Sequence, residues 1–274
     1  QAWFETVIDR QARLIAQWMH ISFIHGVMNT DNMSVAGETI DYGPCAFMDH
    51  YAHDRVYSSI DRHGRYAYNN QPTIGLWNLT RLAETIVPLL AADMEAGIDI
   101  AKTALERYRD SYEGYWLTGM RAKTGLATAQ DEDRILIEEL LDAMAASRAD
   151  FTLTFHYLSQ LQLDSTRHDS RVRTLFKHAE HFDAWAAKWR ARLRQENSVD
   201  ATRQTTMQAV NPVYIPRNHQ IEAAIRAAED HDDFSVFHRL HEVLQDPWQR
   251  QTGKETYLLP PEPHEVVQQT FCGT

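Results

Sequence analysis

The sequence predicts a mainly α-helical protein with one short loop and β segment near its start. Apolar residues recur every three to four positions over long stretches, as they do on one face of an amphipathic helix. The glycine, proline and asparagine residues that interrupt helices gather in two shorter stretches, 23–44 and 61–72. With 274 residues, of which 43 % are hydrophobic, the chain can bury a sizeable core, and its length indicates one or two domains.

The expected elements follow this pattern in chain order. An apolar stripe from Trp3 through Val7 and Leu14 to Met19 predicts the first helix. Residues 23–44 are polar and rich in glycine, which predicts loop and short strands. After residue 72, helical patterns dominate to the end of the chain. The further expected helices span 76–90, 98–112, 132–146, 182–194, 219–228 and 233–244.

Charge and composition exclude several classes of protein. Lys and Arg number 27 and Asp and Glu number 38, which gives a net charge of −11 and disfavours a nucleic-acid partner. The longest apolar stretches fall far short of the roughly 20 residues that cross a bilayer, so we expect no membrane partner. The cysteines, Cys45 and Cys272, are too few for a secreted disulfide framework and lack the spacing of a zinc site. We therefore expect a reducing compartment, a cytoplasm of the bacterial type.

One polar segment has the residue order of a protein-kinase active site. Asn32 follows His25 by seven residues, and Asp41-Tyr42-Gly43 begins nine residues after Asn32. In kinases, a catalytic-loop asparagine and the aspartate of an Asp-Phe-Gly segment hold Mg²⁺. Mg²⁺ prefers oxygen ligands and takes one or two from the protein. Asn32 and Asp41 are therefore candidate metal ligands.

The position of the kinase catalytic aspartate departs from this pattern. It is occupied by Val27, which cannot accept a proton. Asp31 is the nearest carboxylate and our candidate general base. On spacing alone, residues 29–32 are also typical of an ordinary Asx turn, so this alternative stays open at this point.

The complete strings are more specific than the spacing. Residues 25–34 (HGVMNTDNMS) and 39–44 (TIDYGP) closely resemble the signature of the selenoprotein O family of protein adenylyltransferases. The resemblance extends over essentially all 274 residues. Its further motifs are Gly64-Arg65-Tyr66, Asn70-Gln71-Pro72, Trp77-Asn78-Leu79, Met120-Arg121-Ala122-Lys123, Asn211-Pro212-Val213-Tyr214, Arg217-Asn218 and Phe271-Cys272.

This resemblance implies a kinase-like enzyme, of pseudokinase type, that transfers AMP from ATP to Ser, Thr or Tyr hydroxyls of proteins. ATP binds in an inverted orientation, and pyrophosphate leaves. Carried onto matching positions, Asp31 is the proton acceptor, Asn32 and Asp41 are the ligands of Mg²⁺ (with Mn²⁺ as the alternative), and Asp41 also lies against the phosphates of ATP.

The family's organisation implies a C-terminal lobe of a kinase-like fold with a helical extension. We expect residues 1–92 to form the kinase-like catalytic segment and residues 93–274 to form a helical C-terminal region with a redox tail. A glycine-rich loop and a strand lysine do not occur in the 31 residues before Asn32. We therefore expect this chain to be a C-terminal fragment whose partner is a missing N-terminal half. We expect it to bind ATP weakly and to be inactive alone.

The two cysteines have two interpretations. They are either unrelated reduced thiols or, as the family's redox-active terminal cysteine or selenocysteine implies, the partners of a regulatory disulfide between Cys45 and Cys272. Arg217 and Asn218 likewise either bond carbonyl groups between helices or shape the acceptor side of the site. Two other functions also remain: phosphoryl transfer by a protein kinase, which Val27 disfavours, and a non-catalytic helical interaction module.

Overall fold

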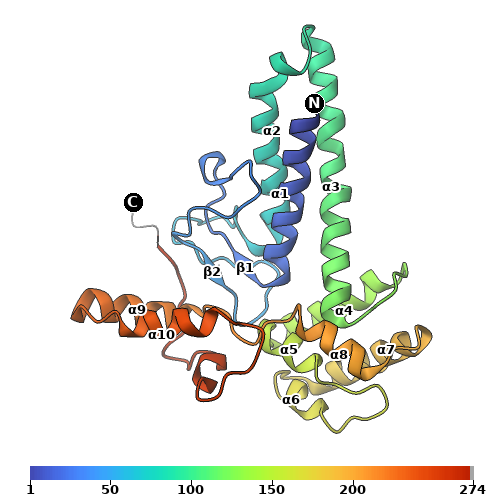
Figure 1. The fold of residues 1–274 in the computed structure, drawn as a ribbon, viewed down its shortest axis with the longest axis vertical. Coiled ribbons are helices and arrows are strands. Elements are labelled where there is room, and N and C mark those ends of the chain that lie inside the picture. Colours follow the sequence, from blue (N-terminus) through green and yellow to red (C-terminus); the bar gives the residue numbers. More distant parts are fainter. Residues whose placement is uncertain (272–274) are drawn as a thin grey trace. The chain divides into compact units, whose positions relative to one another are not determined.

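The computed structural model describes residues 1–271 and confirms a mainly helical protein (Figure 1). The chain divides into two compact units. The first unit contains Gln1–Ala46, His53–Gly119 and, at the end of the described chain, residues 269–271. The second contains Phe47–Ala52 and Met120–Gln268.

Three long helices form the body of the first unit. They are α1 (Ala2–His20), α2 (Gln71–Leu90) and α3 (Met94–Thr124), of which α3 belongs to this unit as far as Gly119. The boundary expected at residue 92 lies in the connection between α2 and α3, inside this unit. Figure 1 shows α1 beside both other helices. The hydroxyl of Tyr115 on α3 donates a 2.8 Å hydrogen bond to Asp9 of α1.

The helices of the first unit pack closely where a glycine permits it. A Cβ atom at Gly75 of α2 would lie 2.3 Å from Ile15 Cδ1 of α1 and 2.6 Å from the Tyr108 hydroxyl of α3. Helix α2 begins before the expected residue 76 because Pro72 lies in its first turn, where the missing N–H costs nothing. The apolar stripe of α1 is buried, as its periodicity predicts.

The expected loop and short-strand segment lies between α1 and α2. It contains β1 (Phe23–Ile24), the 3₁₀ turn η1 (Thr30–Asn32) and β2 (Ala46–Phe47), of which Ala46 belongs to the first unit. An antiparallel bridge joins Met33 to Thr39. A second 3₁₀ turn, η2 (Tyr68–Asn70), leads into α2.

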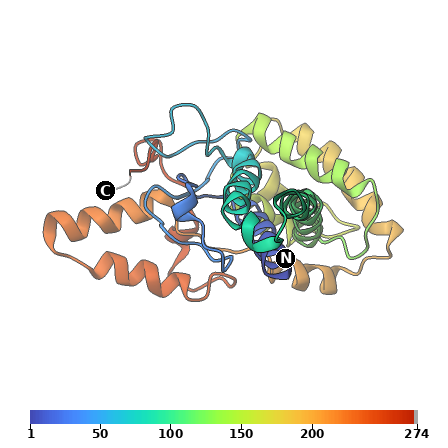
Figure 2. The ribbon, with the colours of Figure 1, turned by 90° about the horizontal axis from the view of Figure 1, so that it is seen from above.

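Shorter helices form the second unit. Helices α9 and α10 lie side by side (Figures 1 and 2), and α4 packs against α7. The Trp185 and Trp189 indoles of α7 stack at 5.7 Å, and their N–H groups donate to the carbonyl oxygens of Leu136 and Thr124. The helices are α4 (Asp133–Ser147), α5 (Phe151–Leu158), α6 (Asp169–Arg173), α7 (Ala179–Gln195), α8 (Asp200–Gln208), α9 (Asn218–His231) and α10 (Ser235–Leu244), followed by η3 (Glu255–Leu258).

Arg217 and Asn218 bind the segment Phe47–Ala52 within the second unit. The Arg217 guanidinium is buried and pairs with Asp49 and, at 2.8 Å, with Asp150. The Asn218 side chain accepts a hydrogen bond from the Phe47 N–H at 3.0 Å and donates one to its carbonyl oxygen at 2.7 Å. These contacts are structural, but they differ from the carbonyl bonds between helices expected from the sequence, because Arg217 binds carboxylates and Asn218 binds the backbone of a strand residue.

Over residues 1–271, each helix is too short or too polar to span a membrane.

Candidate functional site

The candidate loop, residues 25–44, is anchored at its start by a buried histidine. The His25 Nε2 atom lies 2.9 Å from the Ile40 carbonyl oxygen. Because a carbonyl oxygen only accepts hydrogen bonds, Nε2 carries the proton. Burial lowers the pKa of His25, although the nearby Asp41 carboxylate acts in the opposite direction. His25 is thus a neutral anchor that holds the backbone next to Asp41.

Asn32 is oriented by the backbone of the same loop. Its side-chain nitrogen donates a 3.0 Å hydrogen bond to the Val27 carbonyl oxygen. The donor end of the amide is thereby occupied, and Oδ1 is the atom left to accept a donor or bind a cation. The Val27 side chain is buried, as an apolar residue at this position requires.

Asp31 lies beside Asn32 on η1, with an exposed side chain. Within residues 1–271 its carboxylate has no hydrogen-bond donor and no ion-pair partner. A carboxylate in such surroundings is available to accept a proton from an approaching hydroxyl group.

Asp41 has an exposed side chain and an unusual backbone conformation. Its φ angle of 55° lies in the left-handed region, which aspartate and asparagine adopt more readily than most residues. Its carboxylate is close enough to influence both the His25 ring and the Cys45 thiol electrostatically. The structure therefore brings Asp41 to the His25 end of the loop, where the Val27 carbonyl also holds Asn32. A shared Mg²⁺ ion between Asn32 and Asp41 stays a prediction.

Gly26 allows the two ends of the candidate loop to approach each other. Its φ angle is +86°, and a Cβ atom there would lie 2.6 Å from the Pro44 carbonyl oxygen. Any other residue would strain the backbone and displace Pro44, three residues after Asp41. Gly26 is therefore needed for the close approach of the two ends.

Three side chains outside the loop hold it in place, and the sequence alone did not assign them this role. Gln71 accepts a hydrogen bond from the His25 N–H at 3.0 Å, and Asn78 donates one to the Met28 carbonyl at 2.9 Å. The Tyr66 hydroxyl donates a 2.6 Å hydrogen bond to Asn29. The sequence feature that could have identified Gln71 and Asn78 is a polar residue on the apolar face of α2, because buried polar groups need hydrogen-bond partners.

Cys45 is half-buried and is a free thiol in the part of the chain that the structure describes. Burial raises its pKa to about 11, and the Asp41 charge adds to the rise. Cys272, its expected disulfide partner, lies outside the described residues. The expected pairing is therefore a prediction still.

Comparison with known proteins assigns the chain to a family. A family model described as "Protein adenylyltransferase SelO" matches residues 1–245. The chain belongs to this family. The match runs through α10, which ends at Leu244, and thus includes the candidate loop.

Individual family members match over the whole chain. The protein nucleotidyltransferase YdiU of Rhodopseudomonas palustris (strain BisB5) is 56 % identical over 273 residues, which cover 100 % of this chain and 55 % of the relative. The protein of the same name from Rhizobium etli is 52 % identical over 273 residues, covering 100 % and 54 %. The chain spans about half the length of the curated relatives it matches.

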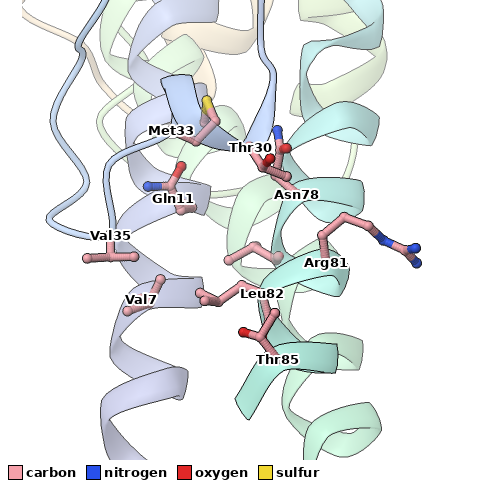
Figure 3. A pocket seen from close by; sticks show the side chains of 10 residues that line it. Val7, Gln11, Thr30, Met33, Val35, Asn78, Arg81, Leu82 and Thr85 are labelled. Carbon is pink, nitrogen blue, oxygen red and sulfur yellow. The ribbon is translucent and has the colours of Figure 1, made fainter. Parts of the chain in front are cut away.

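A pocket of about 260 Å³ adjoins the family's loop in the first unit (Figure 3). Thr30, the residue before Asp31, lines one end, and Thr85 of α2 lies at the other. The Arg81 side chain leaves the wall of the pocket and points outward (Figure 3). The walls between Thr30 and Thr85 are mostly apolar and include Val7, Met33, Val35, Leu79 and Leu82.

Proposed function

We propose that this chain carries the catalytic loop and metal-binding segment of a protein adenylyltransferase. The reaction transfers AMP from ATP to Ser, Thr or Tyr hydroxyl groups of acceptor proteins. Membership of the SelO family and the name nucleotidyltransferase of the relatives support this proposal. The kinase-like order of His25, Asn32 and Asp41 supports a kinase-like arrangement of the site.

One observation carries the proposal. The side-chain nitrogen of Asn32 donates a hydrogen bond to the Val27 carbonyl oxygen, which leaves the amide oxygen of Asn32 available as a ligand. The same loop carries the exposed carboxylates of Asp31 and Asp41. Neither carboxylate has an ion-pair partner within residues 1–271. Amide and carboxylate oxygens are the donors that Mg²⁺ and Mn²⁺ accept. Asn32 and Asp41 therefore fit a cation of this kind.

A bound divalent cation would neutralise charge on the phosphates of ATP. The role proposed for Asp31 is general-base catalysis. Its carboxylate accepts the proton of the acceptor hydroxyl as the hydroxyl oxygen forms a bond to the α-phosphorus of ATP. The bond between the α-phosphorus and its bridging oxygen breaks, and pyrophosphate leaves with that electron pair.

The test uses the complete gene product that contains these residues, incubated with a bacterial lysate as the source of acceptors. ATP carries its label on either the α- or the γ-phosphate. Label from the α-phosphate alone is expected on protein, and Asp31→Asn is expected to abolish it while the protein stays folded. Label from the γ-phosphate would instead identify a protein kinase, and no transfer of either label would favour a non-catalytic module.

A further inference from the structure

We propose that Arg65, Trp77 and Arg81 form a docking surface for an acidic segment of the acceptor protein. This surface lies in the first unit and includes Arg65 and Trp77, two residues of the family motifs to which the catalytic proposal assigns no role. The inference rests on the proposed function, because it identifies the acceptor class of the same site.

Two guanidinium groups lie against one exposed indole. The Arg65 guanidinium carbon is 4.6 Å from the Trp77 ring centroid, and that of Arg81 is 5.5 Å from it. Trp77 is 39 % exposed despite its size. Contact with an aromatic face orients a guanidinium group and leaves its in-plane N–H donors free for carboxylate oxygens.

The loop that carries Arg65 is held in a defined conformation. The Asp61 carboxylate accepts hydrogen bonds from the backbone N–H groups of Arg65 at 2.8 Å and Tyr66 at 2.7 Å. Asn70 donates to the Arg65 carbonyl oxygen at 2.6 Å. The surface is therefore preorganised, which lowers the entropic cost of binding a ligand.

The surface is connected to the candidate loop. Tyr66, the neighbour of Arg65, binds Asn29, which is two residues before Asp31. Arg81 and Thr30 line the same pocket (Figure 3). A polypeptide bound to the surface is thus held next to the proposed general base.

The charge of the surface indicates an acidic ligand. The chain carries a net charge of −11, yet Arg65 has no carboxylate within ion-pair distance among residues 1–271. In the described part of the chain, the ion-pair partner of Arg81 is Glu84, at 2.7 Å and with both side chains about half exposed. Such a surface pair contributes little stability, so a ligand carboxylate can replace it.

The chemistry of the surface favours a peptide over a nucleic acid. A base would have to displace the guanidinium groups to stack on Trp77, whereas carboxylates bind them without rearrangement. The adjacent pocket of about 260 Å³ has apolar walls that suit one aliphatic or aromatic side chain. The predicted acceptor segment therefore combines acidic residues with an apolar residue near the modified hydroxyl.

Fluorescence anisotropy on the complete gene product tests the surface. Three labelled peptides share one tyrosine and one leucine and differ only in their flanking residues, which are glutamate, glutamine or lysine; single-stranded DNA of the same charge is a fourth probe. The glutamate peptide is expected to bind most tightly. Arg65→Glu is expected to weaken its binding by at least about tenfold, the loss of one strong charged contact. Arg109→Glu, the same charge change at an exposed arginine of α3, is the control and is expected to have no effect.

A kinetic measurement separates docking from chemistry. In AMP transfer to the glutamate peptide, Arg65→Glu is expected to raise the KM for peptide and to leave the KM for ATP and the kcat unchanged. Equal binding of the glutamate peptide to the wild-type and Arg65→Glu proteins would overturn the proposal, as would tighter, Arg65-dependent binding of DNA. If the wild-type protein transfers no AMP but binds the glutamate peptide through Arg65, the proposed function fails while the docking surface stands.

Discussion

The side-chain nitrogen of Asn32 lies 3.0 Å from the carbonyl oxygen of Val27, and this hydrogen bond determines which end of the amide faces away from the loop backbone. The bond closes the loop over five residues and leaves Oδ1 as the outward acceptor. It also gives Val27 a role through its backbone, although its side chain cannot take part in proton transfer.

Replacing Asn32 therefore tests the metal ligand directly. Asn32→Ala is expected to lower kcat for AMP transfer by at least about tenfold and to raise the Mg²⁺ concentration needed for half-maximal rate. Activity is measured in the complete gene product over a Mg²⁺ series. Asn69→Ala, at an exposed asparagine of η2, is the matched control. Unchanged Mg²⁺ dependence in Asn32→Ala would show that Asn32 is not a ligand.

Asp41→Asn separates the charge of Asp41 from its backbone conformation. Asparagine tolerates the left-handed φ of 55° about as well as aspartate, so the melting temperature should stay close to that of the wild type. Loss of the carboxylate is expected to abolish AMP transfer. Asp41→Ala should also lose activity and in addition lose stability, by about 1 kcal/mol, because alanine disfavours this conformation. Activity and thermal unfolding of both variants provide the measurement; an active Asp41→Asn protein would remove Asp41 from the site.

Two helices show what the apolar periodicity does not reveal: α5, which the sequence analysis missed, and α3, which it shortened. Almost every residue of α5 is buried, so it lacks the polar face that marks a helix; its start is set by Asp150, which accepts a 2.7 Å hydrogen bond from the Leu153 N–H. Helix α3 continues past the expected residue 112 through Gly119. A Cβ at Gly119 would lie 2.0 Å from the His20 ring, so this glycine serves packing and does not end the helix.

The candidate site could be located from sequence because its residues are close together in the chain. The residues that hold this site in place could not be identified from sequence, because Gln71 and Asn78 bind loop residues that lie 46 and 50 positions away in the chain. The buried pairing of Arg217 with Asp150 depends equally on tertiary structure, since 67 residues separate the two. Local patterns predict helices and short motifs, whereas contacts of this kind follow only from the fold.

A buried lysine in the second unit predicts a pH-dependent stability. Burial lowers the pKa of Lys123 from 10.5 to about 7, with its Nζ 2.8 Å from Asn211 Oδ1. Between these two pKa values the unfolded chain binds a proton at Lys123 that the folded chain does not bind. The contribution of Lys123 to the free energy of unfolding therefore rises with pH through this window and is constant below it.

Urea unfolding of the wild type and of Lys123→Met at about pH 8 and about pH 9.5 measures this contribution. The slope of the free energy of unfolding against pH is expected to be smaller in Lys123→Met, by up to about 1.4 kcal/mol per pH unit. Lys177→Met, at an exposed lysine, should keep the wild-type slope. Equal slopes in the wild type and Lys123→Met would mean that Lys123 titrates alike in the folded and unfolded chain.

The Cys45 thiol is predicted to react slowly at neutral pH. Its pKa of about 11 leaves little thiolate, the reactive form. In Cys272→Ser, which keeps Cys45 as the remaining cysteine, alkylation by iodoacetamide at about pH 8 should be at least about tenfold slower in the folded protein than in urea.

Non-reducing electrophoresis after mild oxidation tests the expected disulfide between Cys45 and Cys272. The wild type is compared with the Cys272→Ser and Cys45→Ser variants. Identical mobility of all three proteins with and without reductant would contradict the disulfide.

Mass spectrometry of acceptor proteins modified by the complete gene product is the most direct test of the proposed reaction. Proteins incubated with ATP and Mg²⁺ are digested, and the mass added to each Ser, Thr or Tyr is determined, with Asp31→Asn as the inactive control. The predicted result is an adenosine monophosphate on hydroxyl side chains in the wild-type reaction and its absence with Asp31→Asn. A phosphate at those positions, or AMP addition that persists in Asp31→Asn, would contradict the proposed chemistry.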